Sequence, residues 1–372
     1  KMLTGDVPWD VEGITLSHDG TMLAYLINED GIDRLRLLDL ETMRERPLPE
    51  LPIGLMGGLT FTRDDKRLAL SLETPVNPAD VFVVDLEASE LQRWTQSETG
   101  GLDASQFVTA ELVRYPTFDQ VDGEPRTIPA FYYKPKGPGP YPVLIDIHGG
   151  PEGQERPGFN PTLQYVVNQL GAAVLAPNVR GSAGYGKSYL KLDNGYLRED
   201  SVKDIGALLD WIEARPELDA NRVVVFGGSY GGYMVLASMT HYNDRLRGGI
   251  DVVGISNFVT FLENTQDYRR DLRRVEYGDE RDPKMREFLI EISPTTNATK
   301  ITKPLFIVQG LNDPRVPASE SEQMVDVIRK AGGDVWYLLA KDEGHGFRKK
   351  GNRDYYRASV MLFLERMFTP NG

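Results

Sequence analysis

The feature that most constrains this chain is a serine between two pairs of glycines, GGSYGG at residues 227–232, with the serine at Ser229. The apolar run Val223 to Phe226 ends just before it, and Tyr233 to Met239 is predicted to form a helix just after it. Strand, sharp turn and helix in this order are typical of a nucleophile elbow, where neighbouring backbone leaves no room for flanking Cβ atoms. We therefore expect Ser229 to project from a strained turn at the carboxyl edge of a sheet; the alternative is a glycine-rich turn without chemistry.

After Asp103 the sequence alternates between strand-like and helix-like segments, which is typical of a mainly parallel sheet covered by helices on both faces. The Pro/Gly-rich stretch 135–142 cannot continue a ladder and is expected to be a surface connection. An apolar stripe from Val202 to Ile212 predicts a helix with Ser201 as its cap. Eight segments are predicted as strands: 107–114, 128–134, 143–147, 172–176, 222–226, 249–253, 305–309 and 335–339.

The first hundred residues contain an internal repeat. Leu16 to Gly20 aligns with Phe61 to Asp65 at an offset of 45, and Asp39 to Glu41 aligns with Asp85 to Glu87 at an offset of 46. Four short strands per repeat of this length are typical of a propeller blade. We predict a partial β-propeller of about two blades; two unrelated β-hairpins with the same turn chemistry are the alternative.

A propeller closes with roughly four to eight blades, so about two blades cannot enclose a chamber. We expect the remaining blades to come from sequence upstream of this chain or from a second polypeptide. The chain begins with a lysine, so any targeting segment would lie further upstream and the sequence predicts no compartment.

Length and charge favour two domains, 1–105 as the C-terminal part of the propeller and 106–372 as the catalytic domain. Residues 1–105 hold 9 Lys+Arg and 20 Asp+Glu, so they carry a net −11 of the chain's −13. This acidity argues against a nucleic-acid partner. No run approaches the roughly 18 apolar residues of a membrane span, so we expect no membrane partner. Zero cysteines exclude a disulfide framework, a thiolate zinc site and a cysteine nucleophile.

A nucleophilic serine needs an adjacent base, usually a histidine that a carboxylate orients. Of the four histidines, His18 lies in the repeat, His148 ends the third predicted strand, and His241 lies about three turns along the helix from Ser229. The remaining one, His345, lies in a glycine-flanked loop after the eighth predicted strand. It is the predicted base; a surface-loop histidine is the alternative.

Asp313 is the predicted carboxylate, because it lies in the loop that leaves the carboxyl end of strand 305–309. Asp342 and Glu343 are nearer to the histidine along the chain, but such close neighbours in one loop more often form a solvated acidic edge. Serine, aspartate and histidine then follow the chain order of α/β-hydrolases, which predicts that fold for residues 106–372.

Acyl transfer also needs two preorganised donors for the oxyanion. One is predicted to be the N–H of Tyr230, the residue after the nucleophile, and the other lies in the turn after the third strand. There Gly150 is favoured and Gly149 is the alternative, while His148 is predicted to be a packed turn residue. This chemistry requires no metal and no organic cofactor.

Together these motifs resemble those of the prolyl oligopeptidase family of serine peptidases, in which an α/β-hydrolase domain is capped by a β-propeller. The resemblance covers almost the whole chain. Besides Ser229, Asp313 and His345, it rests on five segments: HGGP at 148–151, NVRGS at 178–182, GYG at 184–186, RED at 198–200 and GHGF at 344–347.

Within this family the dipeptidyl-peptidase branch places a tyrosine side chain in the oxyanion hole, where this sequence has His148. The chain therefore looks more like the acylaminoacyl-peptidase branch, where backbone N–H groups fill that role. That branch has an arginine near the specificity pocket two residues beyond the catalytic aspartate, here Arg315. Phe258 and Phe261 match positions of aromatic pocket walls in the family; ordinary core packing is the alternative.

The resemblance implies a serine peptidase that cleaves short peptides through an acyl-enzyme on Ser229, because a propeller screens out folded proteins. Two other functions remain open. One is a carboxylesterase that uses the same residues, and the other is a non-catalytic scaffold used for binding.

Overall fold

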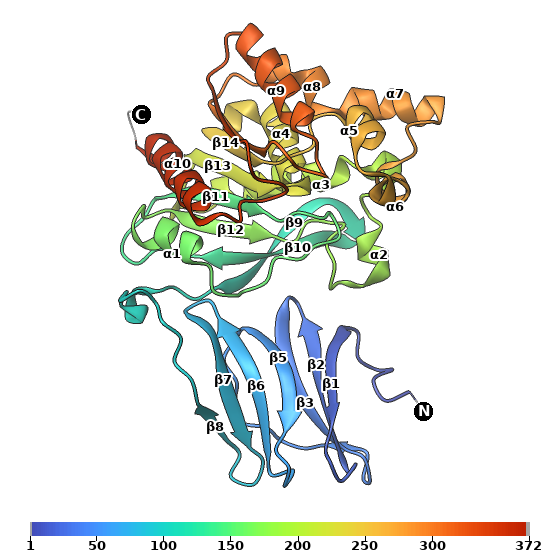
Figure 1. Ribbon diagram of the computed structural model, residues 1–372, viewed down its shortest axis with the longest axis vertical. Helices are drawn as coiled ribbons and strands as arrows, with labels where there is room; N and C mark the ends of the chain where they lie inside the picture. The colour runs from blue at the N-terminus through green and yellow to red at the C-terminus, as the bar shows by residue number, and fades with distance from the viewer. Residues whose placement is uncertain (1, 370–372) are drawn as a thin grey trace. The chain divides into compact units, whose positions relative to one another are not determined.

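The computed structural model describes residues 2–369 and contains two compact units (Figure 1). The first comprises the residues up to Glu111 together with Arg156–Gln164 and Ala183–Lys187. The second comprises Leu112–Glu155, Tyr165–Ser182 and the residues from Ser188 onward. Each unit has its own hydrophobic core. Within residues 2–369, no helix has both the length and the apolar character needed to cross a membrane.

The first unit is built from two four-stranded antiparallel sheets, in which each strand pairs with the next along the chain. One contains β1 (Asp10–Leu16), β2 (Met22–Glu29), β3 (Ile32–Asp39) and β4 (Arg44–Glu45). The other contains β5 (Leu55–Phe61), β6 (Arg67–Thr74), β7 (Asn77–Asp85) and β8 (Glu90–Arg93). Each sheet corresponds to one copy of the sequence repeat, and both fit propeller blades.

The repeated residues make the same turns in both sheets. After β1 the Ser17 hydroxyl donates to Asp19 at 2.7 Å, and after β5 the Thr62 hydroxyl donates to Asp64 at 2.7 Å. After β3 the Asp39 carboxylate accepts from the N–H groups two and three residues on, and Asp85 does the same after β7. These local hydrogen bonds stabilise the turns, which explains why the repeat is clearest at its turn residues.

The second unit contains an eight-stranded sheet in the order β16-β15-β14-β13-β11-β12-β10-β9. Strands β11 to β16 pair in parallel, and β10 pairs antiparallel with β12. Its strands are β9 (Glu111–Val121), β10 (Glu124–Tyr133), β11 (Tyr141–Ile147), β12 (Ala173–Pro177), β13 (Leu218–Gly228), β14 (Gly248–Val252), β15 (Leu305–Gly310) and β16 (Val335–Ala340).

The α-helices of the chain lie between these strands or after the last of them. They are α1 (Pro161–Asn168), α2 (Gly186–Leu190), α3 (Asp200–Glu213), α4 (Tyr230–His241), α5 (Phe258–Asn264), α6 (Asp267–Tyr277), α7 (Pro283–Ile292), α8 (Pro294–Asn297), α9 (Ala318–Lys330) and α10 (Lys350–Phe368).

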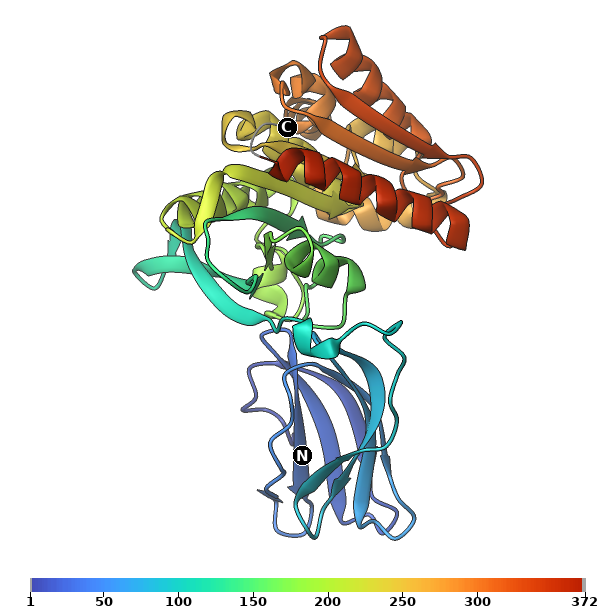
Figure 2. The ribbon, with the colours of Figure 1, turned by 90° about the vertical axis from the view of Figure 1, so that its left-hand side faces the viewer.

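Alternate residues of the central strands face opposite sides of the sheet. One side packs against α3, α4 and α9 in the main core; its strand residues include Val143, Ile145, Val223, Val225, Leu305 and Ile307. On the other side Phe306 packs on Phe363 of α10, with ring centroids 5.8 Å apart. Figure 2 shows α10 lying along that side of the sheet. Both faces are thus covered, which explains why these strands are apolar throughout.

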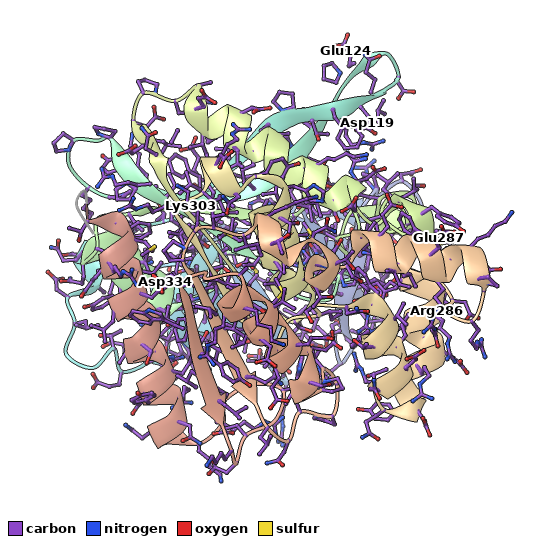
Figure 3. The ribbon with its side chains drawn as sticks, turned by 90° about the horizontal axis from the view of Figure 1, so that it is seen from above. Asp119, Glu124, Arg286, Glu287, Lys303 and Asp334 are labelled. Carbon is purple, nitrogen blue, oxygen red and sulfur yellow. The ribbon has the colours of Figure 1, made fainter. Side chains whose placement is uncertain are left out.

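The first strand of this sheet was predicted at 107–114 but begins at Glu111. The backbone of Val108 is bonded to a side chain instead of a strand, because its N–H and C=O both pair with the Gln164 amide at 2.9 Å. At the other end, the turn Asp122-Gly123 connects β9 to β10 with both residues at positive φ, 52° and 87°. Figure 3 shows Asp119 and Glu124 on this projecting pair of strands.

Candidate active site

Ser229 lies between the end of β13 and the first residue of α4. Its φ of 59° and ψ of −117° are outside the regions that side-chain-bearing residues ordinarily adopt. The backbone is fixed from both sides: the Ser229 N–H donates to the carbonyl of Val252 at 2.8 Å, and the Ser229 carbonyl accepts from the N–H of Tyr233 at 3.1 Å. A strained serine held in this way after a parallel strand has the geometry of a nucleophile elbow.

The glycines around the serine are required by close approach. A Cβ atom at Gly227 would lie 2.4 Å from the carbonyl oxygen of Gly231, and one at Gly231 would lie 2.1 Å from that of Ile147. These distances are far inside van der Waals contact, so neither position accepts a side chain. The glycine pairs therefore let α4 begin directly against the end of β11.

His345 and Asp313 form a hydrogen-bonded pair on loops that follow β16 and β15. The Nδ1 atom of His345 lies 2.7 Å from Oδ2 of Asp313. Because an ionised carboxylate only accepts, Nδ1 carries the proton and Nε2 is the basic nitrogen. The other oxygen of Asp313 accepts from the N–H groups of Arg315 at 2.8 Å and Val316 at 3.0 Å. The aspartate side chain is fully buried, so its orientation is set by these bonds.

The other three histidines have different partners. His18 contacts Asp65, and His241 contacts Glu199. His148 contacts its neighbour's carbonyl through Nδ1 and the Ser182 hydroxyl through Nε2. Burial lowers the pKa of His148, consistent with a neutral, packed turn residue.

Asp342 and Glu343 interact with the start of α10. Asp342 pairs with Lys349, whereas Glu343 accepts from the N–H groups of Arg348 and Lys349. The solvated acidic edge expected for these two residues is wrong for Glu343, which is only 5% exposed. Its carboxylate is buried because it satisfies two backbone donors before the helix.

Three backbone N–H groups are available beside the serine. Tyr230 is the first residue of α4, and Gly149 and Gly150 lie in the turn after β11. Within residues 2–369, these three N–H groups donate to no protein acceptor. A Cβ atom at Gly149 would lie 3.5 Å from that of Ser229, so the turn lies against the serine. The site thus offers unpaired donors at a helix N-terminus and in the adjacent turn.

The turn is also held by a residue that sequence reasoning missed, Arg273 of α6. Its guanidinium donates to the carbonyl of Gly150 at 3.1 Å and forms an ion pair with Glu276. The Glu276 carbonyl in turn accepts from Arg198 at 3.0 Å. Only the three-dimensional fold reveals the role of Arg273, because α6 carries four arginines at similar spacing.

Tyr230 is held by a buried cluster on its other side. Its hydroxyl lies 3.1 Å from Asp193 and 2.8 Å from the hydroxyl of Ser201. Asp193 forms a fully buried ion pair with Arg198 at 2.6 Å. Burial raises the pKa of Asp193, and the nearby Arg198 opposes this rise. Arg198 therefore connects the groups that support both candidate donors, Tyr230 and Gly150.

The NVRGS segment supports the same region. Arg180 forms a buried ion pair with Asp204 at 2.8 Å, and Ser182 contacts His148. Gly181 has a φ of 92°, and a Cβ atom there would lie 2.3 Å from the Asp193 carboxylate. The segment thus packs behind the turn and behind the tyrosine.

Of the residues predicted from the resemblance to form the substrate pocket, two are buried in the main core and one is exposed. Phe258 and Phe261 of α5 are buried in the main core, where both rings pack on Tyr277 at centroid distances of 5.1 and 5.9 Å. Arg315 is exposed, and its N–H donates to Asp313. The structure shows core packing for the two phenylalanines, so their role as pocket walls stays a prediction.

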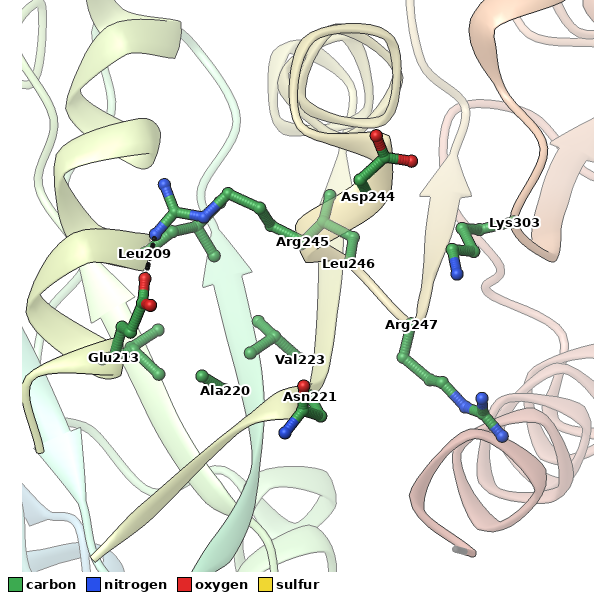
Figure 4. A pocket seen from close by; sticks show the side chains of 11 residues that line it. Leu209, Glu213, Ala220, Asn221, Val223, Asp244, Arg245, Leu246, Arg247 and Lys303 are labelled. Carbon is green, nitrogen blue, oxygen red and sulfur yellow. Dashed lines mark hydrogen bonds and ion pairs between the residues drawn. The ribbon is translucent and has the colours of Figure 1, made fainter. Parts of the chain in front are cut away.

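A pocket separate from the candidate active site lies at the amino ends of β13 and β14 (Figure 4). Its polar lining includes Asn221, Arg247, Lys303 and Arg245, which pairs with Glu213 at 3.3 Å. Ligand sites in open α/β sheets lie at the carboxyl ends of the strands. Ser229 lies at that edge of the sheet, whereas this pocket lies at the opposite edge. In the described part of the chain, no group of three or more acidic or histidine side chains is arranged to hold a metal ion.

The parallel sheet and the elbow after β13 place the second unit in the class of α/β-hydrolase folds. The model of the Prolyl oligopeptidase family matches residues 157–371, more than half of the chain, and the chain belongs to this family. The resemblance identified from the sequence motifs is therefore confirmed.

Two named relatives show the range of the family. Dipeptidyl aminopeptidase BIII of Pseudoxanthomonas mexicana is 36% identical over 234 residues, which are 62% of this chain and 34% of that protein. Acylamino-acid-releasing enzyme 2 of Oryza sativa subsp. japonica is 25% identical over 253 residues, 66% of this chain and 32% of that enzyme. This chain spans about a third of the length of these relatives.

Solved structures agree on the fold. An acylaminoacyl peptidase from Pyrococcus horikoshii superposes with a TM-score of 0.83 at 23% identity, covering 100% of this chain and 58% of that one. A puromycin hydrolase superposes with a TM-score of 0.83 at 20% identity, covering 96% and 53%. The predicted combination of a hydrolase unit with propeller-like sheets is therefore confirmed at the level of the fold.

Proposed function

We propose that this chain carries the catalytic unit of a serine peptidase that cleaves short peptides through an acyl-enzyme on Ser229. The observation that carries the proposal is the 2.7 Å bond between His345 and Asp313. The two residues lie 32 positions apart, in loops that follow two different strands, so only the fold brings them together. The strained conformation of Ser229 supports the same function.

In the proposed reaction the Ser229 hydroxyl attacks the scissile carbonyl and its proton passes to Nε2 of His345. The charge of Asp313 stabilises the imidazolium that forms and keeps Nδ1 protonated. The same proton then goes to the leaving amine, whose bond to the carbonyl carbon breaks. Water attacks the acyl-enzyme with the histidine again as base, which releases the acid and restores the serine.

The tetrahedral intermediate carries its negative charge at the oxyanion. We assign the N–H groups of Tyr230 and Gly150 as its donors, with Gly149 the alternative to Gly150. The unpaired state of these donors supports the assignment, since they need not give up a protein acceptor. Arg273 and Arg198 act as positioning residues for the two donors.

The substrate class follows from the family. The relatives above are named as a dipeptidyl aminopeptidase and an acylamino-acid-releasing enzyme, and both names support a peptide substrate for this chain. His148 contacts Ser182, and backbone groups are available beside the serine, which favours the acylaminoacyl branch. In this proposal Arg315 and the two phenylalanines, Phe258 and Phe261, line the substrate pocket.

The proposed domain division assigns 1–105 to the C-terminal part of a propeller and 106–372 to the catalytic domain. The two blade-like sheets of the first unit support the propeller assignment. We propose that further blades complete it, either from the same polypeptide or from a second chain.

The proposal is tested by comparing turnover of an N-acetyl-alanyl anilide with turnover of the corresponding ester. A peptidase hydrolyses both, and Ser229→Ala abolishes both. Turnover of the ester alone would identify a carboxylesterase and overturn the peptidase assignment. A native protein that turns over neither, and that no fluorophosphonate labels, would be a binding scaffold.

A further inference from the structure

Gln309, the last but one residue of β15, is a polar side chain on an apolar face of the sheet. It is fully buried, and its position along the strand places it on the same face as Leu305 and Ile307, which pack in the main core. Burying an amide in such a core costs free energy unless its donors and its acceptor find partners. An apolar side chain would fill this place without that cost, so the amide needs an explanation.

Both donors and the acceptor oxygen of the Gln309 amide have partners. Its Nε2 donates to the carbonyl of Gly310 at 3.0 Å and to the carbonyl of Val316 at 3.2 Å. Its Oε1 accepts from the hydroxyl of Ser321, in the first turn of α9, at 2.8 Å. Because the two carbonyls can only accept, the NH₂ group must face them and the oxygen must face the serine. The orientation of the amide is therefore fully determined.

The two carbonyls belong to the ends of the loop that carries Asp313. Gly310 is the last residue of β15, and Val316 lies just before α9 begins at Ala318. The N–H of Asp313 donates to the same Gly310 carbonyl at 3.3 Å, and its carboxylate accepts from the N–H of Val316 at 3.0 Å. Both residues that the glutamine holds are thus also direct partners of the aspartate.

A neutral donor suits this place, because the charge of Asp313 is directed at the histidine. The other carboxylate oxygen of Asp313 lies 2.7 Å from Nδ1 of His345. A lysine or arginine could bind the same two carbonyls, but in a buried setting its positive charge would compete with the imidazolium for the carboxylate. An amide holds the loop without that competition.

We infer that Gln309, oriented by Ser321, is a positioning residue that holds Asp313 against His345. This inference rests on the proposed function and adds a residue to the support of its active site. Gln309 acts through the backbone of the loop. Without its amide the two ends of the loop can separate, the bond between Asp313 and His345 should loosen, and the serine hydroxyl should be activated less often.

The experiment uses two measurements that need no peptide substrate. One is the far-downfield NMR resonance of the proton between Nδ1 of His345 and Asp313, which is assigned by its loss in Asp313→Asn. The other is the rate constant for labelling of Ser229 by a fluorophosphonate. Gln309→Met keeps the length of the side chain but removes both donors. We expect it to slow labelling about tenfold and to broaden or shift the resonance.

Two further variants separate positioning from stability. Gln164→Met in the first unit is the matched control, because Gln164 is also buried and its amide also donates to two carbonyls, those of Pro75 and Val108, each at 2.9 Å. It should lower stability but keep the native resonance and labelling rate. Ser321→Ala leaves the donors of Gln309 in place and frees only its oxygen, so it should change both measurements in the same direction by a smaller amount.

The inference is wrong if Gln309→Met keeps the native resonance and labelling rate and is only less stable in urea, or if Gln164→Met changes both measurements equally. If Gln309→Met does not fold, Ser321→Ala decides by the same criterion. A native protein without the resonance would also overturn the inference, because Asp313 would then not hold the histidine. A native protein that shows the resonance but is not labelled would contradict the proposed function instead, and the resonance in the variants would then decide the inference.

Discussion

The two oxygens of the Asp313 carboxylate have different partners. One accepts from the backbone N–H groups of Arg315 and Val316, and the other faces His345. The backbone bonds fix the plane of the carboxylate, and burial prevents its rotation. The aspartate therefore sets both the orientation of the imidazole and the position of its proton.

Replacing this carboxylate by an amide tests its role. In Asp313→Asn the amide N–H₂ can face Nδ1 and favour the wrong tautomer of His345, so kcat should fall on the order of 10⁴-fold. The control is Asp342→Asn, which should retain near-native kcat because Asp342 contacts Lys349 instead of the histidine. The opposite ranking of the two variants in a steady-state assay would contradict the assignment.

Asp251 of β14 gives a second prediction for a single residue. It is 1% exposed, and burial raises its pKa to about 7, with a smaller contribution from the charge of Glu320. The folded state thus keeps a proton that the unfolded chain releases near pH 4, so this group destabilises the fold increasingly as the pH rises from about 4 to 7.

Asp251→Asn keeps the shape of the side chain but cannot ionise. Relative to the native protein, its free energy of unfolding should rise between pH 5 and pH 8 by an amount on the order of 2 kcal/mol. Urea unfolding at the two pH values measures this change. An equal effect of the substitution at both values would show that the native carboxylate does not take up a proton on folding.

Among single residues, the candidate triad could be predicted from the sequence because strand, turn and helix signals are local. Arg273, Asp193 and Asp251 could not, because each owes its role to segments distant along the chain. Ser201 was predicted to cap a helix, but α3 already begins at Asp200. Its hydroxyl contacts Tyr230 instead, a contact across 29 residues that no local pattern encodes.

Two elements, α6 and the turn after β11, depend on each other. The carbonyl of Gly150 accepts a hydrogen bond from the guanidinium of Arg273, which also pairs with the buried carboxylate of Glu276. The helix therefore positions the turn without contacting the reacting atoms.

Arg273→Met should lower kcat for a neutral peptide by about tenfold with a smaller change in KM, because the turn donor loses its alignment in the transition state. Arg273→Lys should recover part of kcat, since an ammonium group can reach the same carbonyl. A purely structural role would instead give a lower unfolding free energy with unchanged kcat in the folded fraction.

At the level of elements, the strands of the second unit could largely be predicted from apolar runs, since seven of the eight predicted segments overlap a strand over most of their length. The first predicted segment, 107–114, starts before the observed strand because the backbone of Val108 is bonded to the Gln164 side chain. The apolar character of Val108 does not reveal this bond. Strand order could not be read from the sequence, because it depends on which crossovers the helices make.

For the whole molecule, the least predictable feature is which segments of the chain make up the first unit. Arg156, far along the chain, belongs to this unit and pairs with Asp33 at 2.5 Å and Glu12 at 2.9 Å. Asp33 is 2% exposed, and burial raises its pKa while Arg156 opposes the rise. A pairing across 123 residues leaves no sequence signal beyond the residue types.

Arg156→Met should lower the unfolding free energy of the first unit by about 3 kcal/mol, because it leaves the Asp33 carboxylate buried without its ion-pair partner. Trp9 and Trp94 lie in this unit, so their fluorescence during urea unfolding reports on it once Trp211 and Trp336 of the second unit are replaced by Phe. Adding Asp33→Asn should recover part of the loss. Additive losses in the double variant would show that the two side chains do not interact.

The proposed function of the whole molecule depends on Ser229 being its nucleophile. The most direct measurement is mass-spectrometric mapping of the residue that a fluorophosphonate modifies. If Ser229 is the nucleophile, the reagent modifies Ser229 alone and leaves Ser229→Ala unmodified, and that variant loses turnover on the order of 10⁶-fold. Modification of another residue, or undiminished labelling and turnover in Ser229→Ala, would contradict it.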